Sequence, residues 1–375
     1  MDILITLRSI VSLMIPPTLI QVKGTYDYSF WIHDNLFMRK TPKASNGSRD
    51  DGAWVAEGIV QDAIFERNKV IGLSNNAVSI TIGYTSDRNS HNITIRNNLF
   101  KDIGVTGGVT VYALQIGMPR QATNQRDTIQ DVYIYNNTFT NSTSNKVSGN
   151  IMIGNDTTLN LVKRIFIRNN IIDDAGAYGY LTFYETQGAG NVTPGLIDSV
   201  FSDHNIIYNN GNSNNPFYRG SGSGARTTTN TKLFESNNIK SNPLLNSDFT
   251  FQYPSSPALH GGVDVGYPYA GTAPDIGAFG YVVANAGSNQ TVYTSGGIAS
   301  VIVGSRSIGA LSWLWKDVSG SGLSSQIINP TSSSTSIVNL IQGTYTFQLA
   351  AMSGLAAMSG LAVSYAIVII NVLPK

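Results

Sequence analysis

The chain has 375 residues, of which 42% are hydrophobic and 13% are charged, and its formal net charge is +1 at pH 7. This balance gives no reason to expect nucleic acid or an anionic membrane as a partner, and it allows a sizeable core and more than one domain. Cysteine is absent, which excludes a disulfide scaffold and a thiolate metal site. The 37 glycines and the lack of long amphipathic stretches predict β-structure with many tight turns.

The N-terminal segment is apolar and invites comparison with a secretory leader. Asp2 and Arg8 interrupt it, however, and no small-residue cleavage site follows. We therefore expect residues 3–7 and 18–24 to be strands of an incomplete first coil, whose N-terminal cap is missing or supplied by another chain. The apolar run at residues 361–373 is too short to cross a bilayer and is interpreted as a final strand.

Between residues 31 and 240 one pattern recurs: alternating apolar residues, a turn that contains asparagine, and further apolar residues. We call these segments the Asn-turn series. Its copies are WIHDNLF (31–37), AIFERNKV (63–70), ITIRNNLF (93–100), VYIYNNTF (132–139), IFIRNNII (165–172), VFSDHNII (200–207) and LFESNNIK (233–240). The matching asparagines are Asn35, Asn68, Asn98, Asn137, Asn170, Asn205 and Asn238, spaced by 30 to 39 residues. A nearly constant spacing of strand plus turn predicts a solenoid whose coils stack in one direction.

A second set of strand-like segments alternates with the Asn turns, and we call it the interleaved series. Its members are residues 18–24, 54–58, 78–83, 113–117, 150–155 and 180–185. Each strand should pair in parallel with its equivalent in the next coil, about 4.8 Å away. The residues expected to stack inward are Ile80, Ile82, Ile93, Ile95, Leu114, Ile116, Ile151, Ile153, Ile165 and Ile167. The asparagines are interpreted as a structural ladder of side-chain amides and not as catalytic residues.

The repeat is lost between about residues 240 and 282, where an irregular capping coil is expected. Beyond it, short strand-like segments separated by Ser/Gly turns predict a β-sandwich of roughly 90 residues. The sequence AMSGLA occurs twice in tandem at residues 351–362 and is expected to lengthen a loop before the last strand. The prediction is thus an all-β chain with a solenoid at residues 1–282 and a sandwich at residues 283–375.

These motifs support a resemblance to two families. The Asn-turn coils resemble the right-handed parallel β-helix repeats of the pectate-lyase-like superfamily over about residues 18–282, and SPALHGG followed by DIGAFGY resembles the end of the helix in many secreted bacterial members. Residues 283–375 resemble PKD-like immunoglobulin-type modules through AGSNQTV, WLWKDVSG and GTYTFQL. The resemblance implies a secreted or cell-surface protein, because such modules serve as spacers or carbohydrate-binding appendages on secreted enzymes and adhesins.

The β-helix resemblance also implies where a catalytic site would lie. Enzymes of this superfamily place acids and bases on one outward sheet face and its flanking loops, which form a groove for an extended polymer. We assign the groove to the interleaved series, whose flanking loops are long. Its outward positions include Lys23, Glu57, Thr81, Gln115, Met152 and Thr182, with Tyr84, Asp156, Tyr184 and Glu185 at or just beyond strand ends.

Asp156 and Glu185 are the best available pair of acids, because they fall on successive coils and a glycosidase needs two carboxyl groups about 5–9 Å apart. Glu57 has no carboxylate neighbour in its column. Lys23 is a candidate cation beside a lyase base. The competing interpretation is that Asp156 and Glu185 are two solvated loop acids and that Lys23 is an exposed edge lysine.

Substrate contacts are expected from aromatic and basic side chains. The candidates are Tyr84, Tyr184, Arg120 and Trp31, with Arg126 and Lys163 as further loop cations. The alternative for the cations is that they only keep the loops soluble. No calcium-binding cluster of acids is evident, so calcium has no support in the sequence, and the four histidines are too scattered for a metal site. No cofactor is expected, and His33 and His204 are interpreted as structural.

The Asn-turn series has two outward columns of its own. The polar column is His33, Glu66, Arg96, Tyr135, Arg168, Asp203 and Ser236. Its opposite-charge neighbours, Glu66–Arg96 and Arg168–Asp203, predict a stabilising ladder worth about 0.2–1 kcal/mol for each pair. The aromatic column is Trp31, Ile64, Thr94, Tyr133, Phe166, Phe201 and Phe234. This column is either a surface for sugar or a neighbouring chain, or a face covered by the protein's own loops or by the sandwich.

Three functions remain open. The first is a secreted lyase or hydrolase acting on an extended acidic polysaccharide. The second is a non-catalytic adhesin or spacer that binds a cell-surface glycan. The third is a viral tailspike, in which the chain would form a homotrimer. None involves nucleic acid or membrane insertion.

Overall fold

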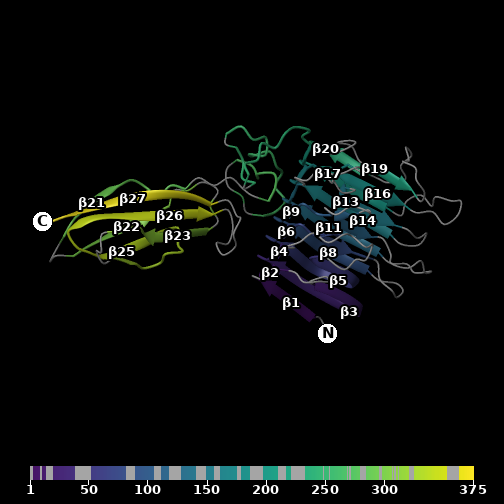
Figure 1. Cartoon of the computed structure of the whole chain (residues 1–375), viewed down its shortest axis with the longest axis horizontal. Coiled ribbons are helices and arrows are strands. Elements are labelled where there is room, and N and C mark those ends of the chain that lie inside the picture. Colours follow the sequence, from purple (N-terminus) through teal and green to yellow (C-terminus); the bar gives the residue numbers. More distant parts are fainter. Residues whose placement is uncertain are drawn as a thin grey trace. The chain divides into compact units, whose positions relative to one another are not determined.

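The structure is a computed structural model of the chain (Figure 1). It describes residues 3–8, 11–13, 20–38, 52–81, 89–104, 111–117, 128–140, 149–155, 161–174, 179–185, 197–209, 217–220, 233–247, 249–252, 254–267, 269, 272–278, 284–294, 298–305, 307, 310, 312–320, 325–352 and 363–375. Contacts divide the chain into two units. One comprises Met1–Leu244, Gln252–Val265 and Asp275–Ala278, and the other comprises Leu245–Phe251, Gly266–Pro274 and Phe279–Lys375.

The first unit is a parallel β-solenoid. The strands of the Asn-turn series are β1 (Ile3–Arg8), β8 (Asn89–Arg96), β11 (Thr128–Tyr135), β14 (Leu161–Arg168), β17 (Ile197–Asp203) and β20 (Leu233–Ser236). The strands of the interleaved series are β7 (Val78–Ile80), β10 (Tyr112–Gly117), β13 (Gly149–Asn155), β16 (Leu181–Glu185) and β19 (Phe217–Gly220). Two long strands, β3 (Ile20–His33) and β5 (Trp54–Glu66), run through both series and join them into one 13-stranded sheet.

A second sheet of short strands follows the Asn turns. Its strands are β2 (Val11–Leu13), β4 (Leu36–Met38), β6 (Lys69–Ile71), β9 (Leu99–Lys101), β12 (Thr138–Thr140), β15 (Ile171–Asp173) and β18 (Ile206–Tyr208). All pairings within the solenoid's two sheets are parallel, and Figure 1 shows equivalent strands stacked coil upon coil. The predicted solenoid is therefore confirmed.

The asparagine ladder is also confirmed. From Asn35 to Asn205, each ladder asparagine donates its backbone N–H and one side-chain N–H to the Oδ1 atom of the next, over 2.8–3.1 Å. Asn98, Asn137, Asn170 and Asn205 are fully buried. An amide that both donates and accepts matches its own copy one coil away, which is why a single residue type repeats at this position.

Each coil also turns through residues with a left-handed backbone, which form three rows that we call the corner rows. The first row precedes the ladder asparagines, with φ of 51–57°, and consists of Asp34, Arg67, Asn97, Asn136, Asn169, His204 and Asn237. The second bends the strands of the Asn-turn series at Asp62, Asn92, Asp131, Arg164 and Ser199. The third follows the short strands at Gly72, Asp102, Asp174 and Asn209. Asp and Asn dominate because they tolerate this conformation better than other residues with a Cβ atom.

The solenoid core consists of columns of apolar side chains. All of the predicted inward residues that the structure describes are fully buried, and Ile82 lies outside the described residues. Phe65, Phe100 and Phe139 add a stack of aromatic rings inside the core, with centroids 4.9–6.3 Å apart. These columns bury most of the apolar surface of the solenoid and provide its main stabilisation.

The segment after the last coil folds back along the side of the solenoid. Asn169 exchanges two hydrogen bonds with the backbone of Val263, at 2.7 and 2.9 Å. Asn136 donates to the carbonyl of Asp275, and Ala278 donates its amide to Thr138 Oγ1. The irregular segment expected at 240–282 therefore binds the first corner row of earlier coils, through side chains that the ladder does not use.

The second unit contains two sheets that share one core. One has the order β21-β27-β26-β23, with β21 (Gln290–Tyr293), β27 (Val363–Leu373), β26 (Gly343–Met352) and β23 (Ser312–Asp317). The other has the order β22-β25-β24, with β22 (Ala299–Gly304), β25 (Ser334–Leu340) and β24 (Gln326–Ile327). Trp315, Phe347, Val303 and Ile337 lie in the shared core, as in a small β-sandwich.

The AMSGLA duplication begins at the end of β26, and residues 353–362 lie outside the described residues. The described ranges contain strands, turns and bends but no helix, so no helix there is long and apolar enough to cross a membrane.

Candidate functional site

Most of the predicted site residues fall where the structure gives little or nothing of their side chains. Asp156, Tyr84 and Arg120 lie outside the described residues. Lys23, Glu57, Tyr184 and Glu185 lie in strands β3, β5 and β16, for which only the backbone is described at these positions. The strand register pairs Lys23 with Glu57, and it pairs Glu185 with Asn155, the residue before Asp156. Their roles stay predictions.

The expected open groove on the interleaved series is not present at its described outward positions. Thr81, Gln115, Met152 and Thr182 are all at most 5% exposed, although they face away from the apolar core. Thr81 donates its hydroxyl to the carbonyl of Ala56, and Gln115 accepts a hydrogen bond from Asn76. The prediction that these four side chains line a groove is therefore wrong. An outward direction on a strand does not by itself give exposure.

The outer face of the Asn-turn series is more accessible, and its ion pairs are as predicted. Arg96 Nε lies 2.6 Å from Glu66 Oε2, and Arg168 Nε lies 2.8 Å from Asp203 Oδ2. His33 and His204 each contact the neighbouring aspartate, at 2.7 and 3.0 Å, as expected for structural histidines.

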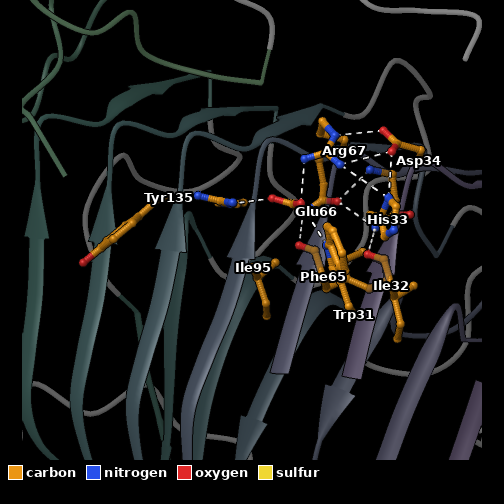
Figure 2. Close-up of polar contacts among 12 residues, drawn as sticks. Trp31, Ile32, His33, Asp34, Phe65, Glu66, Arg67, Ile95 and Tyr135 are labelled. Atoms are coloured by element: carbon orange, nitrogen blue, oxygen red, sulfur yellow. Dashed lines mark hydrogen bonds and ion pairs between the residues drawn. The ribbon is translucent and has the colours of Figure 1, made fainter. Parts of the chain in front are cut away.

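At one end of this face, a cluster of ionisable residues surrounds an exposed tryptophan (Figure 2). Trp31 is 40% exposed, but its indole Nε1–H donates to Glu66 Oε1 at 3.0 Å, and its ring stacks on His33 with centroids 4.2 Å apart. Both contacts fix the orientation of a ring that solvent reaches. We call Trp31 with His33, Asp34, Glu66, Arg67 and Arg96 the Trp31 platform.

The charged residues of the platform form a network of ion pairs with one another. Arg67 binds Asp34 through Nε and a terminal nitrogen, at 2.8 and 3.1 Å, and its other terminal nitrogen lies 2.6 Å from Glu66. Arg96 contacts the second oxygen of Glu66. Asp34 in turn holds His33. Each support of Trp31 is therefore itself held by a charged partner (Figure 2).

The electrostatics of this network identify its role. Burial alone would raise the pKa of Glu66, but the guanidinium groups of Arg96 and Arg67 and the Trp31 indole hold the pKa below its usual value. The pKa of Asp34 is also lowered, because the hydrogen bonds from Arg67 and His33 outweigh its burial. Both carboxylates are thus ionised at neutral pH and have no proton to donate. The cluster is suited to positioning Trp31 rather than to acid–base chemistry.

The aromatic column beyond the platform packs against itself. Tyr133, Phe166, Phe201 and Phe234 form a continuous stack, with centroids 5.0–5.4 Å apart and interplanar angles of 7–18°. Because neighbouring rings cover one another's faces, the inner rings present mainly their edges to solvent. Phe234, which is 52% exposed, ends the stack at β20, and within the described residues no second ring stacks on it. Trp31 and Phe234 are the two aromatic side chains of this column that are exposed to solvent.

Sequence reasoning selected Trp31 but missed Asp34 and Arg67 as its supports. Both occupy the first corner row, where the left-handed backbone breaks the alternation of inward and outward residues. The available signal was the repeated position directly before each ladder asparagine. Among the described residues, no three His, Asp or Glu side chains are grouped so as to hold a metal ion.

No family model matches the chain, and no curated protein matches it. Among solved structures, it is similar to the solution structure of the PKD domain from the KIAA 1837 protein, at 21% identity. The match covers 24% of this chain and 86% of that chain, with a TM-score of 0.20.

Proposed function

We propose that this chain is a secreted or cell-surface, polysaccharide-directed protein that holds an extended glycan on the outer face of the Asn-turn series. In this proposal the solenoid is a right-handed β-helix of the pectate-lyase-like type and the second unit is a PKD-like module, as the sequence motifs suggest. The observation that carries the proposal is Trp31, an exposed ring fixed by Glu66 and His33.

A fixed exposed indole suits a sugar ring for two reasons. The apolar C–H face of a pyranose packs on an aromatic face, and a ring that is already immobilised loses little further entropy on binding. The coils repeat every 4.8 Å or so, which is comparable with the length of one sugar unit in an extended chain. Polar groups in neighbouring coils, among them Arg67 and Arg96, can then contact the ring substituents of successive units.

The test is binding of the purified chain to a panel of neutral and acidic polysaccharides on a glycan array, followed by calorimetry on any hit. We expect Trp31→Ala to weaken binding at least tenfold. Tyr293→Ala, which removes a 61% exposed ring from the sandwich, is the matched control and should bind as the parent does. Binding that survives Trp31→Ala unchanged, or a parent that binds no glycan, would reject the proposal.

A second candidate function is cleavage of an acidic polysaccharide on the interleaved series. The pairing of Asn155 with Glu185 supports it, because Asp156 then follows one residue beyond the partner of Glu185 in the adjacent coil. Glu57, Lys23, Tyr84, Tyr184 and Arg120 would assist as proposed from the sequence. Incubation with uronate-containing polysaccharides, read as ultraviolet absorbance of unsaturated products and as new reducing ends, tests this function. Glu185→Gln should abolish any turnover, and full activity in that variant would remove Glu185 from the proposal.

A trimeric tailspike is the remaining alternative. Its only local support was the aromatic column, most of whose rings pack against one another. A trimer mass in light scattering, without glycan binding by the isolated chain, would favour the spike over the glycan-binding proposal.

A further inference from the structure

The last strand of the Asn-turn series is an edge. Within the described part of the chain, β20 pairs with β17 on one side and with no strand on the other. Phe234, Glu235 and Ser236 are all exposed. A strand edge of this kind presents unpaired backbone donors and acceptors that a further strand can use.

Two repeating interactions of the solenoid, the aromatic stack and the asparagine ladder, end at this edge. The aromatic stack ends at Phe234, whose ring stacks on Phe201 and on no further ring among the described residues. The ladder ends at Asn238, which receives hydrogen bonds from Asn205 but whose own backbone N–H has no acceptor among the described residues. If a further strand pairs with β20, the contacts that repeat in the earlier coils would be continued by an aromatic ring beside Phe234 and by an amide beside Asn238.

A strand added at this edge would also have to match a charge. The charge lies in the column of paired positions that contains the inward-facing Ile167. Its members from Ile167 onward are Ser202 and Glu235, so the column changes from apolar to acidic at the end. Tyr180, which is fully buried, donates its hydroxyl to Glu235 Oε1 at 2.6 Å. The other carboxylate oxygen has no partner in the described part of the chain, and it can accept a hydrogen bond from a basic group.

We propose that β20 is a docking edge for an extended peptide strand, supplied by a partner protein and added in parallel. The strand carries an aromatic residue beside Phe234, a lysine or arginine beside Glu235, and an asparagine beside Asn238. The backbone pairing provides affinity, and the three side-chain positions fix the register and the choice of partner.

A second copy of this chain fits the edge less well. Head-to-tail stacking would place β1 on β20, and the strand register puts Leu7 in the same column as Ile32 and, through the successive coils, Glu235. An apolar side chain would then cover the carboxyl group of Glu235 without giving it a hydrogen bond, which is unfavourable. The acidic column end thus selects against self-association and for a basic partner strand.

The experiment uses the full chain and a synthetic peptide, VFKSNNII, labelled for fluorescence anisotropy. It follows the Asn-turn pattern with lysine in the column of Glu235. We expect saturable binding, a loss of at least tenfold for Glu235→Lys, and a similar loss for Phe234→Ala. Asp62→Lys, which reverses an exposed acid on β5, is the matched control and should bind as the parent does.

A charge swap keeps the test independent of folding defects. The peptide VFESNNII should bind the parent poorly and should recover affinity for Glu235→Lys. Binding that is indifferent to both charges, or absent for all peptides, would overturn the proposal. Concentration-dependent self-association that Glu235→Lys leaves unchanged would overturn it in favour of a second copy. Neither result bears on Trp31, so the glycan proposal stands or falls separately.

Discussion

At the scale of single residues, each ladder asparagine from Asn68 to Asn205 is bonded in both directions along the solenoid. Asn137 accepts from the backbone and side-chain nitrogens of Asn98, and it donates to Asn170 and to the carbonyl of Ile95 in the preceding coil. Its side chain is fully buried. Removing this side chain leaves buried N–H groups without an acceptor, and water does not reach them. The free-energy cost therefore exceeds the net contribution of a single hydrogen bond.

We therefore expect Asn137→Ala to lower the free energy of unfolding by about 2–4 kcal/mol, because two donors of Asn98 lose their acceptor. The measurement is urea denaturation followed by circular dichroism. Asn238→Ala is the control. It also removes an acceptor, but Asn238 is half-buried at the solenoid end, so water replaces it and the loss should stay near 1 kcal/mol. Equal losses in the two variants would show that burial does not govern the ladder.

The Trp31 platform makes stability depend on pH. The usual pKa values of Glu66 and Asp34 are 4.5 and 3.8, and both are lowered in the folded chain. Their contribution is therefore complete above the unfolded pKa values and is lost as pH falls through the lower folded values. Stability should be flat with respect to these two groups between pH 6 and 8 and should fall below about pH 4.5.

Glu66→Gln isolates this contribution. At pH 7 the variant should be less stable by about 2–4 kcal/mol, because the partly buried guanidinium groups of Arg67 and Arg96 both lose the carboxylate of Glu66. The difference from the parent should shrink as pH falls, since the parent then protonates Glu66 as well. Urea midpoints measured from pH 7 to pH 3 give the comparison. A difference that is constant across this range would contradict a lowered pKa for Glu66.

At the scale of elements, the capping segment depends on a glycine at a close approach. Gly277 has φ +102°, and a Cβ atom there would lie 2.6 Å from Ile171 Cδ1. Gly266 has φ +82°, but no atom lies within 4 Å of its Cβ position. The two glycines share a positive φ that would strain a residue with a Cβ atom, and they differ in the space around them, which makes one a control for the other.

Gly277→Ala should lower stability by about 2–4 kcal/mol, which combines backbone strain with overpacking, and Gly266→Ala by about 1 kcal/mol from strain alone. Hydrogen exchange at the amides of Gly277 and Ala278, which bond Asn169 and Thr138, reports release of the segment directly. If the two substitutions cost the same, contact with Ile171 has no part in holding the segment.

Structural features in which the same residue type makes the same contact in every coil were predictable from the sequence, and the other features were not. The ladder and the inward isoleucines follow from amide self-pairing and from alternation along a strand. The second and third corner rows share no single residue type, so Asp62, Arg164 and Ser199 gave no common signal. The path of the capping segment depends on Asn169 meeting Val263, which local pattern does not encode. For the site, exposure of Trp31 was predictable, whereas its supports sit at corners where alternation fails.

At the scale of the whole molecule, the chain holds two separate cores. Phe139 belongs to the solenoid core and Phe347 to the sandwich core, and no residue belongs to both clusters as described. Cores of this kind generally unfold as independent cooperative units when few contacts cross between them.

Calorimetry of the full chain should therefore show two transitions. Phe347→Ala should lower the free energy of unfolding of only one unit, by about 3–5 kcal/mol, and so move only its transition to lower temperature. Phe139→Ala should do the same to the other transition only. A single transition that shifts equally with either substitution would show that the units unfold together.

The asparagine ladder also gives the solenoid an electrical direction. From Asn68 to Asn238 each ladder Oδ1 atom accepts from the preceding coil, and from Asn35 to Asn205 each ladder backbone N–H donates to the following one. Strand dipoles in a sheet largely cancel, but these side-chain dipoles add, as the peptide dipoles of a helix do. The positive pole lies at Asn238, three residues beyond the carboxylate of Glu235. A column of neutral side chains thus favours negative groups at one end of the molecule over the other, and the sequence places an acid there.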